Sequence, residues 1–181
     1  MKATGIVRRI DDLGRVVIPK EIRRTMKIRE GAPLEIYTDR EGVVIFKKYS
    51  PVGEMNGFAE EYAETLHKTC GLGIIICDRD SIITLSGVSK REFLEKNISK
   101  EISELIEERS IYSYIEGSEK VYITDDNREY FASVIAPIVS EGDVIGCVIS
   151  VVSDKNERID SELELKLIQT AAVFLGKRID D

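Results

Sequence analysis

The chain has 181 residues, of which 43% are hydrophobic and 33% charged, and its formal net charge is −7. This hydrophobic content excludes wholesale disorder and a collagen-like fibre, and the length allows one domain or two small ones. The charge is uneven, because residues 1–50 carry 12 basic and 7 acidic side chains whereas the other 131 carry 14 and 26. The sequence predicts a soluble globular protein with a basic N-terminal part and an acidic remainder.

The N-terminal part predicts two hairpins joined by a helical connector. Strands are expected at 5–10, 15–18, 34–38 and 43–48, around turns at 11–14 and 39–42. The connector opens with Pro19, which suits the first position of a helix. So small a domain buries too little apolar surface to be stable alone, and it has no cysteine to cross-link it. We therefore expect an obligate dimer of interleaved hairpins.

A domain boundary is expected close to Pro51 and Gly53, where the charge balance changes sign and the pattern is interrupted. The predicted domains are residues 1–52 and 53–181. The second has an α+β pattern. Helices are expected at 56–69, 90–96, 102–108 and 161–178, and strands at 72–77, 81–85, 120–124, 130–139 and 144–152. A tight turn at 140–143 joins the two longest strands, which predicts an antiparallel sheet with helices beside it.

The last helix is predicted to begin with a capping box formed by Ser161 and Glu164. It carries two apolar rows, and one of them is Leu163, Leu167, Ala171 and Phe174. One row can cover the sheet, which leaves the other for pairing with a second chain. The residues assigned to oligomerisation are Leu165, Ile168, Ala172, Leu175 and Ile179, together with Ala59, Tyr62 and Leu66 of the helix at 56–69.

Neither a membrane span nor a secretion signal is expected. The longest apolar stretch, residues 144–152, is less than half of what a transmembrane helix needs, and Arg8 and Arg9 come before any apolar run long enough for a signal peptide. Three cysteines without CxxC spacing argue against a disulfide framework and a zinc knuckle. We expect a cytoplasmic protein.

Basic side chains are concentrated in the N-terminal part. Arginine suits bidentate contacts with phosphate and with guanine edges, and its charge is permanent at physiological pH. A dimer would present two symmetric copies of the cluster, which is typical of a protein that neutralises phosphates across a two-fold DNA site. The candidate DNA-binding residues are Arg8, Arg9, Arg15, Lys20, Arg23 and Arg24. The alternative is a solvated basic face that only aids solubility.

The N-terminal sequence also resembles a known family. The run from Thr4 to Pro19, with the motif Asp11-Asp12-Leu13-Gly14-Arg15, is similar to the AbrB-type swapped-hairpin domain of bacterial transition-state regulators. The resemblance implies a dimer of interlocked hairpins whose arginines, at 8, 9, 15, 23 and 24, contact double-stranded DNA. It also implies a preference for flexible AT-rich sites, which suits recognition through DNA shape.

The second domain resembles that of a sporulation regulator in the same family. The similarity rests on Ile76-Cys77-Asp78-Arg79-Asp80, on residues 86–90, and on residues 136–139 with 142–146. It implies a GAF-like sensor domain, a homotetramer joined through the body helices, and a nucleoid-associated regulator that activates and represses genes in the developing spore. The expected fold class is thus a β-rich swapped-hairpin dimer followed by an α+β GAF-like domain.

Small-molecule and metal sites find little support. The chain lacks a Cys-His pair for a bilin and the Asn-Lys dipeptide of cyclic-nucleotide binders. Cys77, Ser86 and Tyr130 are the residues that a metabolite pocket would use, but ordinary packing explains them as well and we favour it. A zinc site from His67, Cys70 and Cys77 is disfavoured because the cysteines have apolar neighbours. We expect neither a metal nor a cofactor.

Other functions are weaker candidates. With a single histidine, and with neither a GxSxG elbow nor a P-loop, no enzymatic reaction is indicated. An antitoxin is the alternative, because some toxin-neutralising proteins share the swapped-hairpin N-terminal domain. Such proteins usually continue into a disordered tail that wraps the toxin, whereas this chain continues into a patterned domain. A ligand sensor in which DNA binding is secondary stays open. The leading hypothesis is a DNA-binding transcriptional regulator.

Overall fold

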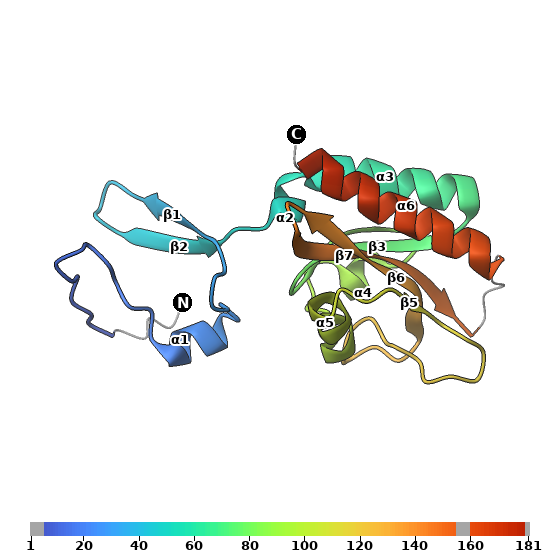
Figure 1. Cartoon of the computed structure of the whole chain (residues 1–181), viewed down its shortest axis with the longest axis horizontal. Helices are drawn as coiled ribbons and strands as arrows, with labels where there is room; N and C mark the ends of the chain where they lie inside the picture. The colour runs from blue at the N-terminus through green and yellow to red at the C-terminus, as the bar shows by residue number, and fades with distance from the viewer. Residues whose placement is uncertain (1–5, 155–159, 180–181) are drawn as a thin grey trace. The chain divides into compact units, whose positions relative to one another are not determined.

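The computed structural model describes residues 6–154 and 160–179 of the chain (Figure 1). It divides into two compact units, Met1–Tyr49, here named the head, and Ser50–Asp181, here named the body. The division falls close to the change in charge balance. Domain limits of 1–52 and 53–181 stay a prediction.

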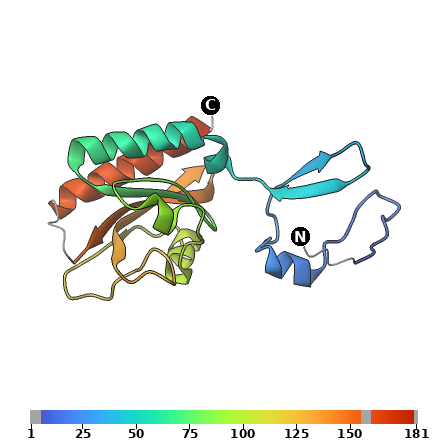
Figure 2. The same cartoon turned by 180° about the vertical axis from the view of Figure 1, so that it is seen from behind.

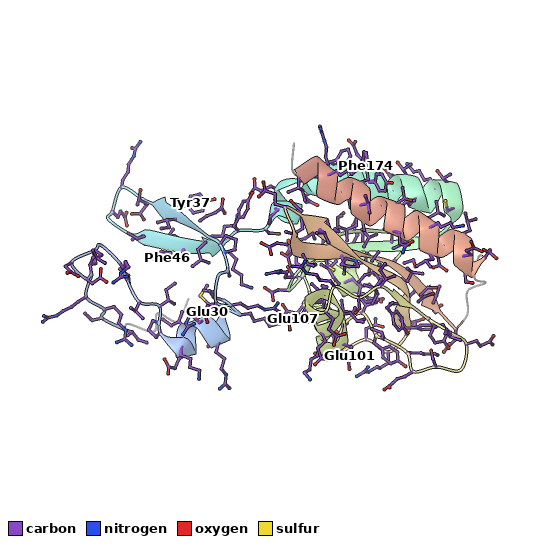
Figure 3. The ribbon with its side chains drawn as sticks, in the orientation of Figure 1. Glu30, Tyr37, Phe46, Glu101, Glu107 and Phe174 are labelled. Carbon is purple, nitrogen blue, oxygen red and sulfur yellow. The ribbon has the colours of Figure 1, made fainter. Side chains whose placement is uncertain are left out.

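The head holds one short helix and one hairpin. Helix α1 is Lys20–Thr25, and strands β1 and β2 are Leu34–Thr38 and Val44–Lys48. The strands are antiparallel, and Ile36 lies directly opposite Phe46. Figure 3 labels Tyr37 on β1 and Phe46 on β2. The second predicted hairpin is therefore present, and Pro19 precedes the helix instead of occupying its first position.

Among the described residues before Pro19 there is no strand, so the strands expected at 5–10 and 15–18 are absent. The turn between them is closed, because the Asp11 N–H donates to the Arg15 carbonyl at 3.1 Å. Beyond the turn the segment has no ladder of backbone hydrogen bonds with any described residue, and Val7 and Val17 are 91% and 73% exposed. A strand needs a neighbour that pairs its backbone groups, and this segment finds none among residues 6–154 and 160–179.

The body is built around a five-stranded antiparallel sheet in the order β4-β3-β7-β6-β5. Its strands are β3 Gly73–Asp78, β4 Ile82–Ser86, β5 Tyr112–Ser113, β6 Tyr130–Ser140 and β7 Asp143–Ser153. Side chains alternate between the two faces, so Ile74 and Ile76 join one core cluster while Ile75 and Cys77 join the other. The expected antiparallel α+β architecture is confirmed.

Helices cover both faces of the sheet (Figures 1 and 2). The body helices are α2 Pro51–Glu54, α3 Asn56–Cys70, α4 Lys90–Phe93, α5 Lys100–Glu107 and α6 Ser161–Ile179. The long helices α3 and α6 pack on one face, and α4 and α5 contribute to the core on the other. No described helix combines the length and the apolar character needed to cross a bilayer.

Three local expectations were wrong. The strand predicted at 120–124 is reduced to one isolated bridge between Tyr122 and Phe131. The helix predicted at 90–96 ends at Phe93, and Glu95 adopts a φ of 63°, which a right-handed helix cannot contain. At the start of α6, Asp160 rather than Ser161 supplies the cap, because its Oδ1 accepts from the backbone N–H groups of the first turn.

Glu164, the other member of the predicted capping box, lies in the core instead. Its side chain is 1% exposed, and its Oε2 accepts a hydrogen bond from Ser133 Oγ at 2.9 Å. The glutamate therefore ties the first turn of α6 to β6.

Candidate nucleic-acid interface

The turn at Asp11–Arg15 fixes the backbone around one candidate arginine. Asp11 Oδ1 accepts from the backbone N–H groups of Leu13 and Arg15 at 3.1 and 2.7 Å, and Gly14 takes the left-handed φ of 76° that the turn requires. Arg15 Nε donates to Asp11 Oδ2 at 2.8 Å while the arginine side chain stays 69% exposed. These hydrogen bonds from Arg15 lower the pKa of Asp11 below its usual value. The turn thus presents a guanidinium to solvent on a defined loop.

The tip of the β1–β2 hairpin repeats this geometry. Asp39 Oδ1 accepts from the backbone N–H groups of Glu41 and Val43, and Gly42 has a φ of 81°. The position that corresponds to Arg15 is Val43, so the second turn holds no arginine there. The two turns share a backbone and differ in the side chain they present.

The other candidate residues are exposed to solvent, fully or in part. Arg8 and Arg9 lie in the extended segment, Lys20 and Arg24 are exposed on α1, and Arg23 is half-buried. Within the described part of the chain, these five side chains form no ion pair. An unpaired arginine loses no internal partner when it binds phosphate. Figures 1 and 2 show the extended segment and α1 on one side of the head, across from the β1–β2 hairpin.

The head also exposes much of its apolar surface. Among the described residues before Val52, Pro19 is the only apolar residue that is buried. Exposed apolar residues of the head are Ile6, Val7, Ile10, Leu13, Val16, Val17, Met26, Ile36, Tyr37, Val43, Val44, Ile45 and Tyr49. A patch this extensive is typical of a surface that another chain covers.

In the body, most of the residues assigned to oligomerisation belong to the protomer's own core. Ala59, Leu66, Ile168, Ala172 and Leu175 are at most 8% exposed and join the cluster between the long helices and the sheet. Leu165, Ile179 and Tyr62 are half-buried at the edge of that cluster. The row that includes Ile168 therefore covers the sheet in this structure.

The other row of α6 is divided between the core and the surface. Ala171 is completely buried and Leu167 is half-buried against the core, whereas Leu163 and Phe174 are 54% and 46% exposed. Phe174, labelled in Figure 3, stacks on Tyr62 and lies against Phe58 with ring centroids 5.5 and 5.8 Å apart. This outer aromatic cluster, defined as Phe58, Tyr62 and Phe174, was not singled out from the sequence, although the second apolar row already contained Phe174.

The three residues considered for a metabolite pocket do not come together. Ser86 lies opposite Ile74 and shares its side of the sheet, whereas Cys77 is buried on the other side. Tyr130 packs edge-on against Phe93, with ring centroids 5.7 Å apart. Their use as one ligand site stays a prediction.

The residues weighed for zinc are engaged elsewhere. His67 Nδ1 lies 2.9 Å from the Leu72 carbonyl oxygen, and Cys77 Sγ lies 3.0 Å from Cys147 Sγ. Among the residues that the structure describes, no three potential ligands are grouped as a metal ion would need.

Two family models match the chain, over different ranges of residues. Residues 54–180 match the family model described as "Stage V sporulation protein T C-terminal, transcription factor", and residues 7–53 match the model described as "Antidote-toxin recognition MazE, bacterial antitoxin". A solved GAF domain/HD domain protein from Geobacter sulfurreducens has a TM-score of 0.51 at 15% identity, covering 69% of this chain and 91% of that one. That likeness concerns the fold alone.

Two relatives from Bacillus subtilis carry the identification. Over 51 residues, 28% of this chain and 52% of the relative, the head is 61% identical to transition state regulatory protein AbrB. Over 180 residues, 99% of each, the chain is 47% identical to stage V sporulation protein T. The expected class, an AbrB-like head followed by a GAF-like body, is confirmed, and the chain belongs to the stage V sporulation protein T family.

Proposed function

We propose that this chain is a DNA-binding transcriptional regulator of sporulation genes, acting as both activator and repressor. The observation that carries the proposal is the set of basic side chains at the surface of a head that is 61% identical to AbrB; among the described residues, only Arg15 of this set forms an ion pair. The side chains that contact DNA are those of Arg8, Arg9, Arg15, Lys20, Arg23 and Arg24. An acidic body, with 26 acidic against 14 basic side chains after residue 50, repels phosphate and leaves the head as the contact surface.

The head binds DNA as a dimer. Its extended segment has no strand partner among the described residues, and many of its apolar side chains are exposed. A second head supplies strand partners for the backbone and covers the apolar surface. Recognition favours flexible AT-rich sites, because the contacts are mainly to phosphates and read DNA shape.

Two head dimers join into a homotetramer through the body. The surface that supports this assembly is the outer aromatic cluster together with Leu163 of α6. Tetramerisation places two heads on one DNA and multiplies their modest individual affinities through effective concentration. Leu165, Ile179 and Tyr62 are half-buried, so part of each side chain is available to this contact between bodies.

The body senses a small molecule. A groove of about 650 Å³ beside α6 supports this part of the proposal. Apolar side chains such as Pro137 and Val139 line it together with polar ones such as Lys166 and Thr170. We place the protein in the cytoplasm, on the nucleoid of the developing spore.

The test is DNA affinity by fluorescence anisotropy with AT-rich and GC-rich duplexes of equal length. Arg15→Ala, Arg23→Ala and Arg24→Ala each weaken binding, by about 1–3 kcal/mol where a base edge is lost, and a lost phosphate contact flattens the salt dependence by about one unit. Arg40→Ala is the matched control, because Arg40 is an exposed head arginine on the other turn. Unchanged affinity in all three variants would refute the proposal.

An antitoxin is the second candidate, because residues 7–53 match the MazE model. The residues that follow form a folded α+β body instead of a toxin-wrapping tail. Stoichiometric co-purification of a small toxin, combined with DNA binding that requires it, would favour the antitoxin over the regulator.

A further inference from the structure

Two cysteines from distant parts of the chain face one another inside the body. Cys77 of β3 is the direct register partner of Cys147 on β7, and their Sγ atoms are 3.0 Å apart. Both side chains are fully buried, and both belong to the core cluster that includes Ile75 and Ile149. No sequence spacing pairs them, because the sheet brings them together from positions 70 residues apart.

The third cysteine is separate from this pair. Cys70 ends α3, is only half-buried, and packs against the core cluster on the other face of the sheet. The chain therefore contains one matched pair of thiols and one internal reference thiol.

We infer that Cys77 and Cys147 are an oxidation site, at which a peroxide converts the two thiols into an intrachain disulfide. A disulfide requires its sulfurs about 2.0 Å apart, so the pair must close by about 1 Å, which side-chain rotation supplies because the strands are already in register. Neither backbone has to leave the sheet.

The chemistry balances in two steps. A sulfur of the pair attacks one peroxide oxygen, the S–O bond forms as the O–O bond breaks, and the departing hydroxide takes the thiol proton and leaves as water. The second sulfur then attacks the resulting sulfenic acid, the S–S bond forms as the S–O bond breaks, and a second water leaves. Two electrons pass from the sulfurs to the peroxide, and two thiols with one peroxide give one disulfide and two waters.

Burial sets the rate of this reaction. Desolvation, together with the hydrogen bond to Cys77, raises the pKa of the Cys147 thiol well above its usual value, so the reactive thiolate is scarce at neutral pH. Oxidation is therefore slow in the native protein, and it accelerates when mild urea opens the sheet. Once formed, the buried bond is equally protected from thiol reductants.

The disulfide would restrain the end of β3, which is also hydrogen-bonded to the first residue of the body. Asp78, the residue after Cys77, accepts a hydrogen bond on Oδ2 from Ser50 Oγ at 3.0 Å, and on Oδ1 from the N–H groups of Asp80 and Ser81. Ser50 is the first residue of the body. A disulfide at Cys77–Cys147 restrains the strand end to which the connection from the head is attached.

The test starts from the fully reduced full-length chain treated with hydrogen peroxide, in buffer and in sub-denaturing urea. We expect the intact mass to fall by two hydrogen atoms, non-reducing peptide mapping to link Cys77 to Cys147, and Cys70 alone to remain open to alkylation. The melting temperature rises by several degrees, because the cross-link restricts the unfolded chain, and dithiothreitol added during unfolding reverses the rise.

Two variants separate this site from general oxidation. Cys70→Ser gives the same mass loss and the same rise in melting temperature, whereas Cys147→Ala gives neither. Peptide mapping of the unaltered chain decides the question even where Cys147→Ala does not fold. Exhaustive peroxide treatment that leaves Cys77 and Cys147 both open to alkylation, or that links either of them to Cys70, overturns the inference.

Discussion

The head and the body solve the problem of burying apolar side chains in opposite ways. The body encloses its own core on both faces of a five-stranded sheet, and Phe93, Ile102 and Ile168 are completely buried. In the described part of the head only Pro19 is buried among the apolar residues, and the extended segment finds no strand partner among the described residues. The body is therefore complete as a protomer, whereas the head depends on a second copy.

This difference separates stability from function along the chain. The unit that carries the candidate DNA-binding arginines is the one whose fold requires association, so DNA binding is linked to assembly. The body supplies stability, and in the proposed assembly it also supplies the surface for further oligomerisation. Substitutions in the body core should therefore act at any protein concentration, and substitutions in the head should act through association.

The largest effect is expected in the body core. Ile168→Ala removes a fully buried side chain between α6 and the sheet, and it should lower the free energy of unfolding by about 3–4 kcal/mol. The matched control is Val173→Ala on the same helix, where the side chain is 58% exposed and the cost should stay below about 1 kcal/mol. Urea unfolding measures both, and equal costs would mean that α6 faces the sheet with a different side.

The next effect tests how closely β3 and β7 approach. A Cβ on Gly146 would lie against the Cys77 carbonyl oxygen, too close for any real contact, so Gly146→Ala should destabilise the body by about 2–3 kcal/mol. Gly57→Ala on α3 is the control, because its Cβ meets nothing and alanine favours the helix by up to about 1 kcal/mol. Thermal unfolding of the two variants should shift in opposite directions, and a Gly146 variant as stable as the parent would contradict the packing.

A smaller effect, dependent on concentration, is expected in the head. Val17→Ser replaces a side chain that is 73% exposed in one chain and that we expect a dimer to cover, so it should weaken head association by about 2 kcal/mol per chain. Sedimentation equilibrium measures the dissociation constant. Ile115→Ser serves as the body control, because Ile115 is also 73% exposed, and an unchanged constant for Val17→Ser would place the dimer contact elsewhere.

The smallest effect concerns pH and the Asp11 turn. Hydrogen bonds from Arg15 lower the pKa of Asp11 from its usual 3.8, so the carboxylate stabilises the folded turn above that value and the contribution is lost as the pH falls through the lower, folded-state pKa. Amide chemical shifts of Leu13 and Arg15 between pH 6 and pH 2 follow this loss. Asp11→Asn keeps an acceptor oxygen and should abolish the titration, and an identical titration in that variant would assign it to another group.

Much of the body was predictable because its periodicity is local. The helix at Asn56 and the two long strands follow from alternating or helical apolar spacing, and their observed bounds differ little from the expected ones. Glu95 was not predictable in this way, because its positive φ is imposed by the surrounding loop. Sequence spacing also cannot tell which row of an amphipathic helix faces the sheet, so Ile168 and Ala172 were assigned to an interface although they lie in the core.

The structure of the head was harder to predict from the sequence. The strand pattern at residues 5–18 is present in the sequence, yet the described residues offer it no strand partner, and alternation alone could not predict an unpaired segment. The candidate arginines could be predicted from charge clustering and from resemblance to a family. Cys147 was missed as a partner of Cys77, because only the register of β3 and β7 reveals the pair.

The most direct test of the central claim is hydrogen–deuterium exchange of the full chain with and without an AT-rich duplex. The division of roles predicts slower exchange at residues 6–27 in the complex, with Arg15→Ala reducing that protection and Arg40→Ala leaving it intact. It predicts no new protection on the sheet of the body. Protection that appears over β3–β7 while residues 6–27 exchange unchanged would contradict the assignment of DNA binding to the head.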